Sequence, residues 1–166
     1  MIWVETIIDN SIRSTIFFDL GNTLVAKING KYKLYRDTSD TLKLLHDRGY
    51  RLGLLSNLPK DCTIDNVYSS LKKYRIASYI EYDLITISSE LPGNIQKPDK
   101  RIFDLALKKS GLITAGNNII FVTEEFEHIL AARCYGWRAI LKRNSGECKP
   151  EDGECVSSLS GLLNLL

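Results

Sequence analysis

The chain has 166 residues, a length typical of a single domain that buries its core without help from disulfides or metals. With 22 Lys and Arg against 20 Asp and Glu, its net charge of +2 is too small to indicate binding to nucleic acid or to an anionic membrane. No apolar run approaches the ~18 residues of a membrane span, and the N-terminal stretch lacks a signal-peptide pattern. We therefore expect one soluble, cytoplasmic domain over residues 1–166, in which residues 1–14 form an extension of unknown role.

The first strand is predicted by the apolar stretch that ends at Phe18, and it leads Asp19 into a Gly-Asn-Thr turn. Because a carboxylate is costly in a core, we expect Asp19 at the carboxyl edge of the sheet, where open α/β sheets bind ligands. Residues 25–35 then place Asn29-Gly30 between apolar-polar stretches, the pattern of a tight hairpin. The sequence thus predicts a small flap directly after Asp19.

The remaining elements alternate between helical and strand patterns. Strands are expected near residues 50–55, 80–87, 118–122, 137–141 and 155–156, and helices near 38–48, 63–74, 98–110, 124–135 and 159–166. This alternation predicts a mainly parallel sheet with helices on both faces, a three-layer α/β/α, Rossmann-like sandwich.

The four cysteines are Cys62, Cys134, Cys148 and Cys155. They show neither the close pairing of a disulfide framework nor the spacing of metal ligands, which favours reduced thiols in a cytoplasmic protein. Cys148 and Cys155 share a polar loop, so a bond between these two is the alternative that the sequence leaves open.

Polar side chains follow the ends of four predicted strands: Asp19, Ser56 with Asn57, Lys97, and Glu124. The carboxyl ends of parallel strands meet at one edge of a sheet, so these groups are expected to converge. Taken alone, Ser56 reads as a turn hydroxyl and Lys97 as a solvated surface lysine. Their joint order indicates a site.

Four motifs in this order resemble the haloacid dehalogenase (HAD) superfamily of hydrolases. They are Phe-Asp-Leu-Gly-Asn-Thr-Leu at 18–24, Leu-Leu-Ser-Asn at 54–57, Lys-Pro-Asp-Lys-Arg-Ile-Phe at 97–103, and Ile-Ile-Phe-Val at 119–122. The resemblance spans roughly residues 15–166 and is to the capless, phosphatase-like branch, because the flap is too short to hold an inserted cap domain.

The resemblance implies that Asp19 attacks phosphorus to give an aspartyl-phosphate, which water then hydrolyses. Ser56 would donate a hydrogen bond to the phosphoryl oxygens and Lys97 would neutralise their charge. A Mg²⁺ ion would bind Asp19, the carbonyl of Gly21 and the Glu124 carboxylate. The implied substrate is a phosphorylated small molecule or macromolecule.

Two further residues, Asn22 and Asn57, are expected to bind substrate together with Gly21. At Gly21 the chain departs from the family pattern, which usually has a second Asp there to protonate the leaving group. Glycine carries no proton, so ordinary ester hydrolysis would lose about 10²- to 10⁴-fold. In the fourth motif, Thr123-Glu124 replaces the usual Gly-Asp, and His128 stands where relatives have a later Asp.

Three functions remain open on these departures. The first, which we favour, is a magnesium-dependent phosphatase, weakened by the missing acid, whose acid comes from elsewhere or whose substrate has a good leaving group. The second is a non-catalytic domain that binds a phosphorylated ligand or protein. The third, disfavoured by the absent cap, is metal-independent substitution at carbon, as in the dehalogenase branch. The sequence is compatible with proton transfer by His128, or by Glu125 or Glu127 in its place. A simple hydrogen bond from His128 to Glu124 is also compatible with it.

The flap carries a basic cluster of Lys27, Lys31, Lys33 and Arg36. This cluster either draws an anionic substrate toward Asp19 or only protects a strand edge from pairing. Without a cap, the site either admits a bulky substrate or is covered by a second subunit, and the sequence decides neither question.

Overall fold

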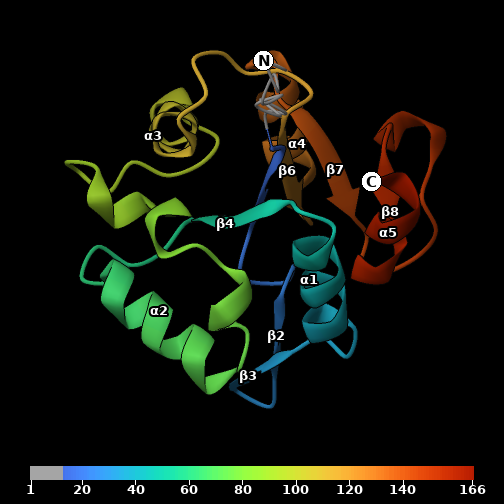
Figure 1. Cartoon of the computed structure of the whole chain (residues 1–166), viewed down its shortest axis with the longest axis horizontal. Coiled ribbons are helices and arrows are strands. Elements are labelled where there is room, and N and C mark those ends of the chain that lie inside the picture. The colour runs from blue at the N-terminus through green and yellow to red at the C-terminus, as the bar shows by residue number, and fades with distance from the viewer. Residues whose placement is uncertain (1–12) are drawn as a thin grey trace, which may run out of the picture.

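A computed structural model describes residues 13–166, and Figure 1 shows a central sheet with helices packed against it. The sheet has six parallel strands in the order β5-β4-β1-β6-β7-β8. The strands are β1 (Thr15–Phe18), β4 (Arg51–Ser56), β5 (Ile85–Ile87), β6 (Ile119–Thr123), β7 (Arg138–Lys142) and β8 (Cys155–Val156). The expected parallel sheet is therefore confirmed.

Helices cover both faces of the sheet, as the alternating pattern predicts. They are α1 (Thr38–Asp47), α2 (Ile64–Lys73), α3 (Lys100–Ser110), α4 (Phe126–Cys134) and α5 (Leu162–Leu165). One hydrophobic cluster joins α1, α2 and α5 to one face, and a second joins α3 and α4 to the other. Adjacent residues of β1 point to opposite faces, so Ile16 and Phe18 belong to the first cluster and Phe17 belongs to the second.

The predicted flap is the hairpin of β2 (Val25–Ile28) and β3 (Lys31–Leu34), which pair antiparallel. Its turn residues, Asn29 and Gly30, have φ values of 51° and 77°, as a primed hairpin turn requires. Between β1 and α1 the chain builds this hairpin and its flanking turns, so no cap domain is inserted there.

The expected strand at 80–87 is mostly wrong. The segment contains the 3₁₀ turn Tyr82–Leu84, preceded by another at Ala77–Tyr79, and pairs with β4 only over Ile85–Ile87. Gly53 explains part of this packing, because a Cβ there would lie 2.7 Å from the Leu84 Cβ. The segment around Leu84 can therefore pack closely on β4 without pairing with it as a strand. The hydropathy pattern does not distinguish such packing from strand pairing.

Other element bounds differ by smaller amounts. Helix α4 begins two residues after the expected start, because the Thr123 hydroxyl accepts a bond from the Glu125 amide and holds residues 124 and 125 in a turn. The last expected helix is a 3₁₀ turn, Leu159–Gly161, followed by the four-residue α5. Further 3₁₀ turns occur at Ser88–Glu90 and Pro150–Asp152.

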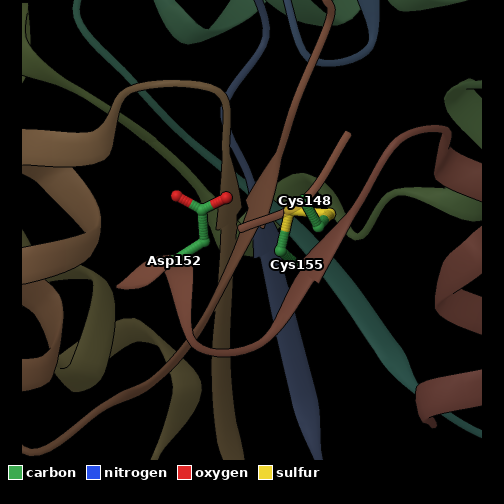
Figure 2. A group of neighbouring side chains, drawn as sticks. All are labelled: Cys148, Asp152 and Cys155. Atoms are coloured by element: carbon green, nitrogen blue, oxygen red, sulfur yellow. A yellow bond between two sulfur atoms is a disulfide. The ribbon is translucent and has the colours of Figure 1, made fainter. Parts of the chain in front are cut away.

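The expectation of reduced cysteines is wrong for one pair, because Cys148 and Cys155 form a disulfide (Figure 2). The 3₁₀ turn at 150–152 reverses the chain and brings the two Cα atoms to 5.8 Å. Asp152 lies beside the bridge, but its carboxylate already accepts bonds of 2.6 and 2.7 Å from Arg143. This group of side chains is therefore a structural clamp on the loop before β8.

None of the helices in residues 13–166 has the length and apolarity needed to cross a membrane. Most of the expected N-terminal extension, residues 1–12, lies outside the described residues.

Candidate active site

The predicted site residues converge at the carboxyl edge of the sheet. Asp19 follows β1, Ser56 ends β4 and Thr123 ends β6, and β1 is paired with both of the other strands. This pairing places the three side chains side by side at the centre of the edge. The convergence follows from the parallel register and confirms the placement that we expected for Asp19.

The Asp19 carboxylate accepts four hydrogen bonds, two on each oxygen. Oδ1 accepts from the Ser56 hydroxyl at 3.0 Å and from the backbone amide of Leu20 at 2.8 Å. Oδ2 accepts from the Thr123 hydroxyl at 3.1 Å and pairs with Lys97 Nζ at 2.7 Å. The side chain is 11% exposed, so these donors hold it in one orientation while part of it still reaches the surface.

Lys97 lies behind Asp19 with no exposed side-chain surface. Its ammonium also donates to the Leu55 carbonyl at 2.7 Å and lies 5.1 Å from the centre of the Phe121 ring. Burial lowers the pKa of Lys97, and the Asp19 carboxylate opposes this effect. The ordinary surface interpretation of Lys97 is therefore wrong, because the lysine is the buried counter-charge of Asp19.

Asn57 holds the segment that carries Lys97. Its side-chain oxygen accepts from the Lys97 amide at 2.7 Å, and its side-chain nitrogen donates to the Lys97 carbonyl at 3.1 Å. Because both ends of the side-chain amide are engaged, Asn57 positions Lys97. Asn57 also lines the cleft in front of Asp19, and its expected contact with substrate stays a prediction.

The turn after Asp19 is fixed by residues from far along the chain. Asn22 has a φ of 55°, and its carbonyl accepts from Asn144 at 2.7 Å and from the Tyr35 hydroxyl at 3.3 Å. The Asn144 side chain also accepts from Lys142, whose pKa burial lowers to about 8. These bonds anchor the backbone beside Gly21.

Two glutamates form the acidic side of the site. Glu124 accepts a bond of 3.4 Å from the Asn22 side chain, and Glu125 follows it in the loop before α4. Burial, Glu125 and Asp19 together raise the pKa of Glu124 above its usual range. This excess of negative charge is a favourable environment for a cation.

His128 lies on the first turn of α4 and lines the same cleft as Asp19. Its Nδ1 is buried and has no hydrogen-bond partner among residues 13–166, so a bond to Glu124 is not formed there. Burial and the nearby Lys97 charge lower the pKa of His128, and the charges of Asp19, Glu125 and Glu127 oppose this shift. The imidazole is therefore a neutral group near neutral pH.

A cleft of about 510 Å³ opens in front of Asp19. Gly21, Asn22, Ser56 and the two glutamates line the end near Asp19. Tyr32 on the flap, Tyr74 after α2, and Leu58 and Pro59 after β4 line the same cleft.

Sequence reasoning did not select Thr123, Tyr32 or Tyr74 as site residues. In the sequence, Thr123 stood out only because it departs from the expected Gly-Asp pair. In the structure it ends the strand next to β1, and its hydroxyl donates to Asp19. The two tyrosines come from the flap and from the end of a helix, and only the folded chain brings them to one cleft.

No family model matches the chain, and no curated protein is similar to it in sequence. Among solved structures, an uncharacterized protein from Listeria monocytogenes serotype 4b is 24% identical with a TM-score of 0.75, over 92% of this chain and 98% of that one. A HAD phosphatase from Thermococcus onnurineus is 22% identical with a TM-score of 0.67, over 81% of this chain and 58% of that one.

A third similar structure is D,D-heptose 1.7-bisphosphate phosphatase from B. bronchiseptica, complexed with magnesium and phosphate. It is 14% identical with a TM-score of 0.66, over 92% of this chain and 99% of that one. The chain spans only 58% of the Thermococcus phosphatase and 57% of a similar dehalogenase. These likenesses show the fold of HAD-superfamily hydrolases and confirm the resemblance that the motifs indicated.

Proposed function

We propose that this chain, which has the fold of HAD-superfamily hydrolases, hydrolyses phosphate monoesters through an aspartyl-phosphate on Asp19. The observation that carries the proposal is the set of four donors on the Asp19 carboxylate, at the inner end of an open cleft. A carboxylate fixed in this way is oriented for attack and costs little further ordering when substrate binds.

In the first step, a carboxylate oxygen of Asp19 forms a bond to phosphorus, and the bond from phosphorus to the leaving oxygen breaks. Ser56 and Thr123 are the hydroxyl donors beside the reacting group, and Lys97 supplies a positive charge. Donors held in place before the reaction stabilise the charge that develops on the phosphoryl oxygens. In the second step, water attacks phosphorus and releases Asp19 and inorganic phosphate.

The donor set near Asp19 fits magnesium, because it consists of hard oxygens and carries excess negative charge. We assign Asp19, the Gly21 carbonyl and Glu124 as the groups that would hold the ion. Bound there, Mg²⁺ would neutralise charge on the phosphoryl group. The magnesium and phosphate in the similar B. bronchiseptica phosphatase support this assignment.

The site lacks the usual side chain for proton transfer at position 21. Gly21 has no side chain to protonate the leaving group, so the first step depends on a leaving group that departs as an anion. We assign His128 to the second step, because a neutral imidazole in the cleft suits a base that accepts a proton from water.

The test is hydrolysis of a generic aryl phosphate by the purified protein, with and without Mg²⁺. Turnover that requires Mg²⁺ and disappears in Asp19→Asn establishes the phosphatase, provided that the variant melts like the parent. Equal turnover in Asp19→Asn would overturn the role of the nucleophile. If no turnover is found, binding of a phosphorylated ligand to the intact cleft becomes the function to test, since Gly21 lacks the usual acid.

A further inference from the structure

We infer that the substrate is an aryl phosphate, a phosphate ester of a phenol such as the tyrosine side chain. This inference rests on the proposed function and adds the class of leaving group. It is carried by two independent features of the cleft, the absence of an acid at Gly21 and the presence of an aromatic wall.

The first feature concerns the leaving group. A phenol has a pKa of about 10, as tyrosine does, whereas an aliphatic alcohol is a far weaker acid, comparable with water. A phenolate therefore departs from phosphorus without a proton, and an alkoxide does not. Since the backbone of Gly21 lines the cleft where the family's acid would lie, the site favours the phenol ester.

The second feature concerns the wall of the cleft. Tyr32 and Tyr74 both line it, and the Tyr74 hydroxyl lies 3.5 Å from the Tyr32 carbonyl, so the flap meets the end of α2 at this wall. Leu58 and Pro59 add apolar surface from the loop after β4. Aromatic rings bind other rings in stacked or edge-to-face arrangements, and an apolar wall favours a ring over a sugar or a polar chain.

The size and charge of the cleft also agree with a ring that carries a phosphate. Its volume of about 510 Å³ lies within the usual range for small-molecule sites. Lys27 Nζ lies 5.9 Å from the centre of the Tyr32 ring, so the flap presents a cation beside the aromatic wall. This cation attracts a phosphate dianion toward the cleft, where the phosphate would lie against Asp19 and the aromatic ring against the apolar surface.

The Tyr32 side chain is 56% exposed, and no cap domain is inserted beside it. The same chemistry can therefore arrive as a free aryl phosphate or as a phosphotyrosine within a protein. The assay compares phenyl phosphate, a phosphotyrosine peptide, the matching phosphoserine peptide, and acetyl phosphate. Acetyl phosphate has a good leaving group but no ring.

We expect kcat/KM for phenyl phosphate or for the phosphotyrosine peptide to exceed that for the phosphoserine peptide by at least about 100-fold. Tyr32→Ala combined with Tyr74→Ala should lower kcat/KM for the aryl substrates by about tenfold and leave acetyl phosphate within twofold. The matched variants Tyr32→Phe and Tyr74→Phe keep the rings and should retain aryl activity.

Three results would overturn the inference: an unchanged aryl activity in the double alanine variant, an equal loss on acetyl phosphate, or comparable hydrolysis of phosphoserine. Asp19-dependent hydrolysis of acetyl phosphate alone would also overturn it while leaving the proposed phosphatase in place. If neither acetyl phosphate nor any aryl phosphate is hydrolysed, the proposed function itself fails.

Discussion

Placing an acid at position 21 is the most direct test of the proposal that this site lacks a proton donor for the leaving group. Gly21→Asp places a carboxyl group two residues after Asp19, where it can protonate a leaving oxygen. The structure accommodates the change, because a Cβ at Gly21 meets no atom within 4 Å and the residue does not have a positive φ. The substitution therefore adds a proton donor without forcing the turn to move.

The expected gain depends on the leaving group. General acid catalysis contributes about 10²- to 10⁴-fold, which corresponds to about 2.7–5.4 kcal/mol of activation free energy. We expect a gain of this order in kcat/KM for an alkyl phosphate such as glycerol phosphate. For an aryl phosphate, whose phenolate departs unaided, we expect a change of less than about fivefold.

The measurement is steady-state hydrolysis of both substrates by Gly21→Asp, with Gly21→Asn as the control of equal size. An amide cannot donate the proton in the same way, so Gly21→Asn should leave alkyl activity at the parental level. If Gly21→Asp does not raise alkyl activity above Gly21→Asn in a folded protein, the missing acid is not what limits this site.

The remaining predictions concern the buried pair, the cation site and the packing of the sheet. Lys97→Met should lower the free energy of unfolding in urea by about 3 kcal/mol, because it leaves the Asp19 carboxylate buried without its cation. Adding Asp19→Asn to this variant should recover part of the loss. If the losses of the two substitutions simply add, the two side chains do not act as a pair. Saturating Mg²⁺ at 100 times Kd should raise Tm by roughly 5–10 °C, and Glu124→Gln should reduce that shift. The shift should shrink on acidification earlier than for an ordinary glutamate, because the raised pKa of Glu124 protonates this ligand at a higher pH; a shift independent of Glu124 and of pH would place the ion elsewhere. Gly53→Ala should cost about 1–3 kcal/mol, because its Cβ would lie 2.7 Å from neighbouring atoms, whereas Gly116→Ala, with open space around it, should cost nothing measurable.

The parallel sheet could be predicted because its signals are local. The strands are short apolar runs, the helices repeat their apolar residues at helical spacing, and the Asn29-Gly30 pair specifies the hairpin turn. The segment 80–87 was misassigned because its apolar residues pack through 3₁₀ turns, and burial alone does not distinguish such turns from a strand. The bond between Cys148 and Cys155 depends on a chain reversal that spacing does not encode.

The candidate site also has a part that the sequence predicts and a part that only the folded chain reveals. Asp19, Ser56 and Lys97 stand in recognisable motifs at strand ends, so their convergence could be predicted from the parallel order. The partners that fix the turn beside Gly21, Asn144 and Tyr35, belong to no motif, and they become visible only when β7 and the flap are in place. Nothing in the sequence alone distinguished their amide and hydroxyl groups from those of solvated side chains elsewhere on the surface.

The proposed nucleophile, Asp19, and the glycine at position 21 depend on different parts of the fold. The donors to Asp19 lie on β4, on β6 and on the buried Lys97, so the fold itself holds the carboxylate. Position 21 lies in the turn toward the flap, where a Cβ meets no other atom and no packing depends on the residue. Under the proposed mechanism, glycine at position 21 supplies no proton but leaves the attack of Asp19 on phosphorus undisturbed, which is why we propose phosphate esters whose leaving group needs no proton.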